Sequence, residues 1–510
     1  MAKPAIVFIG FMGAGKSTAL EAARKAGLET TEIDELMEAE LGKPIRQAFE
    51  EDGEEAFRAR EAEVVGSLLE KAEGDAIALG GGSILSERVR KALGRHIVVL
   101  LEIDAATAWK RIEGTERPLA TSEEDVAALL AERAPYYEEL ADAVIPIADR
   151  RVLERALPAI RALDELPERT RLLWASSASG DYPIFVGHGL LRADWWPLGG
   201  RRFLVADAFN IRHYKDRLVK SFLGIDVIVD GEEKKTLDEV REILEDMARK
   251  GMTREDHVVA LGGGVTGDVA GFCASLYQRG VPVVQVPTTL VAQVDSAYGG
   301  KTGVDLPQGK NYAGAYHLPS AVIADLDTLR TLPREELAAG FVEALKTGLL
   351  AGGALWEEVR AIEELSPADL DGVVFACARY KCAVVAADER DAGRRHVLNL
   401  GHTVGHGIET ASDYTRYRHG EAIGLGLLAA LRLSDAPDLR EEVRAILARH
   451  GLPVTLDRAI AADDIIEALE RDKKRTAAGV GFVLLSEPGQ PRTGEIIDPA
   501  KVREAVEELY

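Results

Sequence analysis

Residues 10–17, GFMGAGKS, have the glycine spacing and the closing Lys-Ser pair of a phosphate-binding loop. Glycines let successive backbone N–H groups curl around phosphates, and a helix that begins at the lysine adds the positive end of its dipole. Lys16 can then reach the β- and γ-phosphates of a nucleotide, and the Ser17 hydroxyl can bind Mg²⁺. The alternative is a glycine-rich turn with a chance lysine. The apolar run at residues 5–9 and the helical pattern after the loop favour phosphate transfer.

Polar side chains that could hold a phosphate acceptor follow this loop. Glu32 and Asp34 come after a plausible second strand, where a metal-organising carboxylate and a base for an acceptor hydroxyl would lie. The other candidates are Arg58, three residues before Glu61 on one helix face, the glycines at 80–82, Arg117 and Arg133. Taken singly, each arginine is more often a solvated surface charge, so the prediction depends on the whole set.

A second group of residues suits a nicotinamide cofactor and an anionic substrate. Residues 262–267, GGGVTG, contain the spacing GxGxxG after a predicted strand, although a generic tight turn fits this pattern equally well. Lys301 and Lys310 follow on glycine-rich stretches. Two lysines this close suit a substrate that carries both a phosphate and a carboxylate.

Histidines concentrate in one short segment. Four of the ten lie between His396 and His419, and His402 and His406 share a helix face. Glu343 lies on an earlier predicted helix. One carboxylate with two imidazoles leaves coordination positions open, which is typical of a catalytic Zn²⁺ site. Helix packing is the alternative for any single histidine, and spacing alone leaves open which two of the three would bind metal.

The elements that would position these residues alternate between short apolar strands and helical segments. Strands are predicted at residues 5–9, 76–79, 97–101, 203–206, 227–229, 258–261, 283–286 and 322–324. This alternation is typical of βαβ units and parallel sheets. From about residue 332 onward, Ala, Leu, Glu and Arg at helical spacing dominate the sequence.

We therefore expect an α/β protein with three folded parts. A P-loop kinase domain with a parallel sheet would occupy residues 1–165, and a polar Ser/Gly-rich stretch makes residues 166–180 the expected linker. A Rossmann-like α/β NAD-binding part would follow at residues 181–330, and a mostly helical metal- and substrate-binding part at residues 331–510. A chain of 510 residues has room for two to four domains.

Composition and charge narrow the class of protein. Hydrophobic residues make up 46% and charged residues 29% of the chain, which excludes a disordered, collagen-like or disulfide-scaffold protein. The net charge of −23 repels phosphate backbones and anionic lipids, so we expect no nucleic-acid or membrane partner. Three cysteines without a CxxC pair, and no secretory signal, indicate a reduced cytoplasmic chain. The expected partners are small-molecule substrates, and a homodimer through the C-terminal half is left open.

Together the N-terminal motifs resemble those of shikimate kinases over residues 1–165. The matching segments are GFMGAGKST, the acidic pair, FRxxE, the triple glycine, RPL and ERxPxYxExAD at residues 132–142. The resemblance implies that shikimate is held by Asp34, Arg58, Gly81, Gly82 and Arg133, with Asp34 near the attacking hydroxyl. MgATP would be bound by Gly13, Ala14, Gly15, Lys16, Ser17, Thr18 and Arg117, the last on a mobile lid. Glu32 stands where the family usually has Asp.

Residues 181–510 resemble 3-dehydroquinate synthases along nearly their full length. The matching segments are GGGVTGDVAGF, YQRG, VPTTLVAQVDS, GGKTGV, GKN, LDTLRTLP, an ExxK pair, RHVLNLGHTVGHGIE and HGEA. The resemblance implies that Glu343, His402 and His419 bind Zn²⁺ or Co²⁺. It also implies a catalytic set of His406, which binds substrate and assists proton transfer, with Lys301 and Lys346.

The same resemblance implies two larger sets of contacts. NAD would be bound by Asp207, Asn210, Glu232, Lys235, Gly263, Gly264, Val265, Asp268, Thr288, Thr289, Lys301, Lys310, Thr331 and Leu332. The substrate would be bound by Arg279, Asp295, Lys301, Lys310, Asn311, Lys346, Lys381, Arg395, Asn399 and one of Lys473 or Lys474.

The implied protein joins two non-consecutive steps of the shikimate pathway. One is ATP-dependent phosphorylation of shikimate, and the other converts 3-deoxy-arabino-heptulosonate 7-phosphate to 3-dehydroquinate and phosphate. One alternative is another P-loop small-molecule kinase fused to another sugar-phosphate cyclase or a polyol dehydrogenase; Arg58, Arg133 and the lysines argue against it. A second alternative is that one half is a silent regulatory or scaffold module. The intact Lys16 and Glu343 argue against that.

Overall fold

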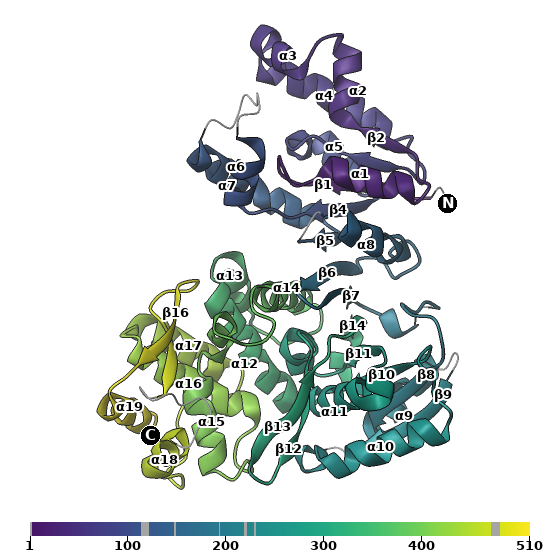
Figure 1. Ribbon diagram of the computed structural model, residues 1–510. Coiled ribbons are helices and arrows are strands. Elements are labelled where there is room, and N and C mark those ends of the chain that lie inside the picture. The colour runs from purple at the N-terminus through teal and green to yellow at the C-terminus, as the bar shows by residue number, and fades with distance from the viewer. Residues whose placement is uncertain are drawn as a thin grey trace. The chain divides into compact units, whose positions relative to one another are not determined.

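The computed structural model describes residues 3–113, 122–146, 149–192, 194–218, 222–228, 231–470 and 480–510. It divides into two compact units. Unit 1 comprises Met1–Ser176 and Asp181–Pro197, and unit 2 comprises Ser177–Gly180 and Leu198–Tyr510. Purple and blue mark most of unit 1 in Figure 1, and teal to yellow marks unit 2.

A parallel sheet forms the centre of unit 1. Its first five strands are β1 (Ile6–Ile9), β2 (Thr30–Glu32), β3 (Ala76–Ala78), β4 (Ile97–Leu101) and β5 (Ala143–Ile145), in the spatial order β2-β3-β1-β4-β5. All of these pairings are parallel. Every residue of β1 and β4 is buried, because helices cover parallel sheets on both faces. The phosphate-binding loop therefore leaves the carboxyl end of a central strand, where α/β sheets bind ligands.

Helices account for most of the rest of unit 1. They are α1 (Lys16–Lys25), α2 (Ile33–Leu41), α3 (Ile45–Asp52), α4 (Glu54–Leu69), α5 (Glu87–Leu93), α6 (Ala105–Ile112), α7 (Glu123–Leu140) and α8 (Arg150–Ala162). Short 3₁₀ turns lie at Ser83–Leu85 and Leu190–Arg192.

The segment expected to be a linker instead contains a strand. Residues 171–177 form β6 (Arg171–Ser177), which pairs in parallel with β5, and β7 (Gly180–Gly187) follows after a two-residue turn. Leu172, Leu173 and Trp174 of β6 are buried. Their apolar run outweighs the Ser/Gly-rich stretch at residues 176–180, of which only residues 178 and 179 form the turn.

In the first part of unit 2, five strands pair in parallel in the order β14-β11-β10-β8-β9. The strands are β8 (Arg202–Asp207), β9 (Phe222–Ile228), β10 (His257–Gly262), β11 (Val283–Pro287) and β14 (Ala321–Asp325). The helices are α9 (Ala208–Leu218), α10 (Leu237–Arg249) and α11 (Gly264–Leu276), and β12 (Lys301–Leu306) and β13 (Gly309–Tyr316) form an antiparallel hairpin. A one-turn π-helix, η5 (Ala292–Ser296), and the 3₁₀ turns Glu232–Lys234, Tyr277–Arg279 and Leu326–Thr331 complete this part.

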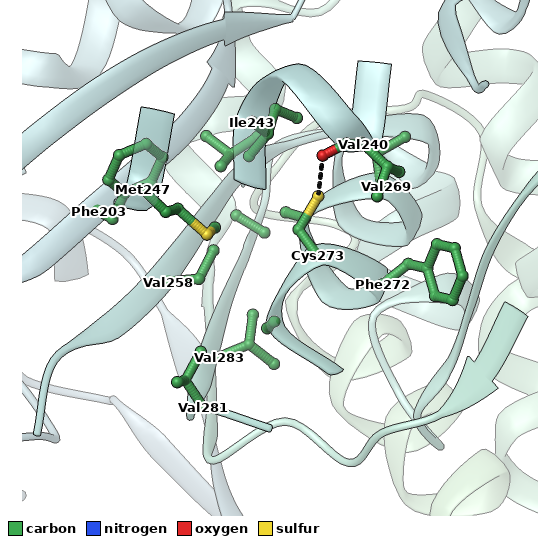
Figure 2. Close-up of a cluster of buried hydrophobic side chains, with 14 of the residues drawn as sticks. Phe203, Val240, Ile243, Met247, Val258, Val269, Phe272, Cys273, Val281 and Val283 are labelled. Atoms are coloured by element: carbon green, nitrogen blue, oxygen red, sulfur yellow. Dashed lines mark hydrogen bonds between the residues drawn. The ribbon is translucent and has the colours of Figure 1, made fainter. Parts of the chain in front are cut away.

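The apolar core of this part lies between the strands and helices α10 and α11 (Figure 2). Phe203, Val258 and Val283 project from the strands toward Met247 of α10. Cys273 of α11 is fully buried in the same cluster, and Cys377 and Cys382 are buried as well. The expectation that the cysteines are packing residues is confirmed.

The remainder of unit 2 is mostly helical, as expected. Its helices are α12 (Arg334–Ala351), α13 (Gly353–Ala361), α14 (Asp371–Ala387), α15 (His402–Ala411), α16 (His419–Leu433), α17 (Pro437–Arg449), α18 (Ala462–Glu470) and α19 (Pro499–Glu507), with a 3₁₀ turn at Arg394–Asn399 and a hairpin of β15 (Gly481–Leu485) and β16 (Pro491–Ile496). Helix α12 is buried from Leu337 to Leu350 because α13, α14 and α16 surround it. Within the described ranges, no helix has the length and apolar character needed to cross a membrane.

Candidate active sites

The glycine-rich loop of unit 1 joins the end of β1 to the start of α1. Gly10, Gly13 and Gly15 have φ angles of 149°, 79° and 95°, which favour glycine. A Cβ on Gly10 would also lie 2.6 Å from the carbonyl oxygen of Leu101 in β4. The loop therefore has the backbone shape of an anion-binding turn at a helix N-terminus.

Lys16 and Ser17, the two residues of this loop predicted to contact phosphate and Mg²⁺, are held by hydrogen bonds. Lys16 Nζ donates to the carbonyl oxygens of Gly10 at 2.9 Å and Phe11 at 3.1 Å. Ser17 Oγ donates to Glu32 Oε1 at 2.6 Å. Glu32 thus contacts the predicted Mg²⁺ ligand directly, although it stands where the resembling family usually has Asp.

A cavity of about 420 Å³ brings most of the predicted phosphate-binding residues together with two of the predicted acceptor residues, Asp34 and Gly81. It is lined by Gly13, Gly15, Lys16, Ser17, Thr18, Glu32, Asp34, Gly81 and Arg111. Arg111 was not predicted; it lies in the last turn of α6 and donates from Nη1 to the Gly13 carbonyl at 2.8 Å. Arg117, predicted to contact ATP, lies outside the described residues.

Arg58 lies beside the triple glycine, as the acceptor prediction requires. Its Nη1 donates to Glu61 Oε2 at 2.7 Å, and Glu61 also accepts from Ser83 Oγ at 2.7 Å. A Cβ on Gly82 would lie 2.5 Å from the Arg58 guanidinium carbon. Glycine is needed here because the cation packs against the backbone.

Arg133 reaches the same glycines from α7. Its Nη1 donates to the Gly81 carbonyl at 3.1 Å, and Tyr137 OH donates to that oxygen at 2.6 Å. Tyr137 was not predicted, although it belongs to the quoted motif at residues 132–142. Burial raises the pKa of Tyr137 to about 12, so its hydroxyl remains a donor at neutral pH.

A larger cavity, of about 1680 Å³, occupies unit 2. Most of the residues predicted to bind NAD and substrate line it: Asp207, Asn210, Glu232, Lys235, Gly263, Gly264, Val265, Asp268, Thr288, Thr289, Asp295, Lys301, Lys310, Asn311, Thr331, Leu332, Lys381, Arg395, Asn399, His406 and His419. Arg279 is not among the lining residues and lies on an exposed turn. Lys473 and Lys474 lie outside the described residues.

The glycine-rich turn after β10 is closely packed. A Cβ on Gly262 would lie 2.5 Å from Thr266 Oγ1, and one on Gly263 would lie 3.0 Å from Thr289 Cγ2. Helix α11 begins at Gly264, and Gly263, Gly264 and Val265 line the cavity. The N-terminus of α11 therefore forms part of the cavity wall. That arrangement suits the pyrophosphate of a dinucleotide.

Every lysine predicted for this site within the described residues forms an ion pair with a carboxylate. The pairs are Lys235–Asp268 at 2.7 Å, Lys310–Glu232 at 3.4 Å, Lys346–Glu343 at 2.5 Å, Lys381–Asp295 at 2.7 Å and Lys301–Asp391. Arg395 is buried and donates from Nη1 to the Glu389 carbonyl at 2.9 Å. The cations are therefore fixed in place by protein partners.

Glu343, His402 and His419 converge from three helices. Glu343 Oε1 lies 3.6 Å from His402 Nε2 and 3.5 Å from His419 Nε2, and one ligand atom from each residue lies within 4.8 Å of the others. Glu343 is 1% exposed, and among the described residues Oε1 has no hydrogen-bond partner. A buried, unpaired carboxylate oxygen facing two imidazole nitrogens fits a divalent metal ion.

The pKa values of the cluster agree with that fit. Burial lowers the pKa of His402 well below its ordinary value, so its imidazole is neutral. Burial opposes the charge on Glu343, but the neighbouring cations of Lys346 and His419 outweigh it and hold the pKa of this carboxyl well below its usual range. Burial also opposes charge on His419, yet the nearby carboxylates of Glu343 and Glu409 raise its pKa to about 10. The cluster thus favours a positive charge between these carboxylates.

The comparisons with known proteins agree with this geometry. Family models of the N-terminal and C-terminal parts of 3-dehydroquinate synthase match residues 225–339 and 340–475. The 3-dehydroquinate synthase of Symbiobacterium thermophilum is 40% identical over 351 residues, which is 64% of this chain and 98% of that protein. The chain belongs to the 3-dehydroquinate synthase family. The shikimate kinase family model matches residues 12–163, so the chain joins a shikimate kinase domain to the synthase.

Two solved structures with the synthase fold contain NAD⁺ and a divalent metal ion. A 2-deoxy-scyllo-inosose synthase complexed with carbaglucose-6-phosphate, NAD⁺ and Co²⁺ is 26% identical, with a TM-score of 0.61, and covers 66% of this chain and 100% of its own. The 2-epi-5-epi-valiolone synthase of Streptomyces hygroscopicus, with NAD⁺ and Zn²⁺ bound, is 26% identical, with a TM-score of 0.58 over 64% of this chain and 96% of its own.

Proposed function

We propose that unit 1 transfers the γ-phosphate of MgATP to shikimate. The observation that carries this proposal is that Lys16, Ser17 and Asp34 line one shared cavity. Lys16 would neutralise the phosphates, and Ser17 with Glu32 would hold Mg²⁺. Asp34 would accept the proton of the attacking hydroxyl, and Arg58 with Arg133 would pair with the shikimate carboxylate.

We propose that unit 2 converts 3-deoxy-arabino-heptulosonate 7-phosphate to 3-dehydroquinate and phosphate. The metal ligands would be Glu343, His402 and His419, and the remaining predicted residues would bind NAD⁺ and substrate as assigned above. When bound, NAD⁺ would supply a transient oxidation at one carbon, and the metal ion would polarise the oxygen at that carbon. The observation that carries this proposal is the Glu343 cluster, whose His419 lines a cavity that four of the predicted lysines also line.

The chain's own residues would then bind, orient and move protons. Lys301, Lys310 and Arg395 would hold the phosphate and carboxylate of the substrate, which fixes the reacting carbon in place. His406 lines the cavity with its side chain 40% exposed, so it is accessible for proton transfer to or from a bound substrate.

Two other functions share parts of this site. Another sugar-phosphate cyclase would use the same metal and NAD⁺, but the named cyclases of that kind are 26% identical, against 40% for the 3-dehydroquinate synthase of S. thermophilum. A polyol dehydrogenase would bind an uncharged substrate and would not need the four lysines that line the cavity.

Net redox change separates the proposal from a dehydrogenase. Because the hydride removed in each turnover must return, the full chain should release one phosphate per heptulosonate phosphate with only catalytic NAD⁺, and no NADH should accumulate. Phosphate release and absorbance at the NADH band measure both quantities in one sample. Stoichiometric NADH with a polyol, and no phosphate release, would replace the synthase with a dehydrogenase. Shikimate-dependent ADP formation tests unit 1 in parallel.

A further inference from the structure

Glu409 of α15 is a buried carboxylate that neither sequence motif assigned a role. Its side chain is 7% exposed, and its Oε1 lies 3.2 Å from Nδ1 of His419, the first residue of α16. The other ring nitrogen of His419, Nε2, lies 3.5 Å from Glu343 Oε1. The imidazole therefore lies between two carboxylates, one at each nitrogen.

We infer that Glu409 is a positioning residue, which fixes the ring orientation and tautomer of His419 so that Nε2 faces the metal ion. The inference rests on the metal site proposed above. A carboxylate only accepts hydrogen bonds, so Nδ1 of His419 must carry the hydrogen that it shares with Glu409. A metal-bound His419 then has its lone pair on Nε2, toward Glu343.

The ring orientation and tautomer of His402 are fixed in the same way, but by a backbone carbonyl and not by a carboxylate. Its Nδ1 lies 3.2 Å from the carbonyl oxygen of Leu400, and its Nε2 lies 3.6 Å from Glu343 Oε1. Both histidines therefore donate from Nδ1 and turn Nε2 toward one buried carboxylate. The partner of His402 is backbone, so substitution cannot remove it, whereas the partner of His419 is a side chain that can be replaced.

The rival is that Glu409 is itself a metal ligand. His406, Glu409 and His419 form a second group whose ligand atoms lie within 4.8 Å of one another. His406 Nε2, however, is 4.0 Å from Glu409 Oε2, and the His419 atom facing Glu409 is Nδ1. An ion held there would leave the buried Oε1 of Glu343 uncompensated. The geometry favours a supporting role for Glu409.

Metal affinity of the full chain decides between these roles. Metal-stripped protein is titrated with Zn²⁺ against a chromophoric chelator, and with Co²⁺ while the visible absorption spectrum is recorded. Glu409→Ala should weaken binding of both ions about 10–100-fold, the usual effect of removing a carboxylate behind a ligating histidine. Binding should remain one ion per chain with the same Co²⁺ spectrum. Glu409→Gln should retain most of the affinity, because its amide oxygen can still accept from Nδ1.

A matched control lies two residues beyond His419 on the same helix. Glu421 accepts from the Arg418 backbone N–H at 2.8 Å and caps α16, so Glu421→Gln removes a nearby charge and should leave metal affinity unchanged. NAD⁺ binding and shikimate kinase activity check that each variant is folded. If Glu409→Ala does not fold, Glu409→Asp, which withdraws the oxygen and keeps the charge, replaces it and should also weaken binding.

Two outcomes would overturn the inference. Unchanged affinity in Glu409→Ala, or in Glu409→Asp where that replaces it, would show that His419 needs no such partner. Equal losses in Glu409→Ala and Glu409→Gln, with an altered Co²⁺ spectrum, would make Glu409 a ligand. His402→Ala tests the underlying site separately and should abolish tight binding. If His402→Ala bound metal normally, the proposed metal site would fail and not merely the role of Glu409.

Discussion

At the scale of single residues, replacing Lys16 with alanine should lower kinase turnover by at least about 10²–10³-fold, the usual cost of removing one group that stabilises developing charge. The ammonium is the charge nearest the phosphates, and the loop amides alone cannot replace it. Synthase turnover should not change. Lys25→Ala is the control, since that lysine lies on the same helix with its side chain 59% exposed and pairs with Glu154. Loss of both activities in folded Lys16→Ala protein would contradict the separate-site assignment.

Removing the metal should silence only the synthase. The carboxylate of Glu343 and the imidazoles of His402 and His419 come from three helices and lie close enough together to bind one metal ion. Treatment with a chelator should stop phosphate release from the heptulosonate phosphate, and Zn²⁺ or Co²⁺ should restore it. Kinase activity, assayed afterwards with excess Mg²⁺, should survive. Full synthase activity in protein shown to be metal-free would refute the assignment.

Motif spacing predicted residues that the structure brings together at the cavities better than the residues that contact them from neighbouring elements. Lys16, Ser17 and Asp34 share one cavity, and the three predicted metal ligands meet, because their types and spacing carry chemistry. Glu409 and Arg111 were missed because each is an ordinary charged residue on a helix. Their contacts, with His419 and the Gly13 carbonyl, arise only when distant elements pack together.

At the scale of elements, the turn between β6 and β7 supports a predicted substrate residue. Ser179 in this turn donates from its backbone N–H and its hydroxyl to the two carboxylate oxygens of Glu389, at 2.8 and 2.6 Å. The Glu389 carbonyl in turn accepts from Arg395 at 2.9 Å. The turn therefore restrains the segment that precedes Arg395.

Ser179→Ala should raise the synthase KM for heptulosonate phosphate several-fold and change kcat less. The substitution removes one hydrogen bond, worth about 1.5–3 kcal/mol because its acceptor is charged, to the carboxylate that anchors the Arg395 segment. Ser176→Ala serves as the comparison, because the Ser176 hydroxyl has no hydrogen-bond partner among the described residues. Steady-state kinetics of both variants measure the effect. An unchanged KM in Ser179→Ala would mean that Arg395 does not depend on the turn.

The hairpin of β6 and β7 is also where the secondary structure predicted from the sequence was wrong. The predicted βαβ alternation was confirmed because strands such as β4 and β10 are continuous buried apolar runs. Strand β6 was read as linker because the polar residues on either side of it outnumber its short apolar run. Only its pairing with β5 shows that this run extends a sheet.

At the scale of the whole molecule, a fragment of residues 1–197 should be a more stable kinase than one of residues 1–168. The shorter fragment lacks β6, which pairs with β5. The backbone edge of β5 and its buried residues Ala143 and Val144 would therefore be exposed to solvent. Urea unfolding midpoints and shikimate-dependent ADP formation measure the difference. Both fragments should phosphorylate shikimate if the domain is separable. Identical midpoints would mean that β6 adds nothing to the stability of the kinase fold.

Four described lysines line the large cavity of unit 2, and each has a carboxylate beside it, so its charge is cancelled until an anion takes that carboxylate's place. An approaching sugar phosphate is therefore influenced at long range by the net charge of −23 and not by the lysines. That repulsion extends over a screening length of about 8 Å at physiological ionic strength. Added salt shortens this length, so capture of the anionic substrate should become faster as salt rises, until the salt anions themselves compete for the lysines.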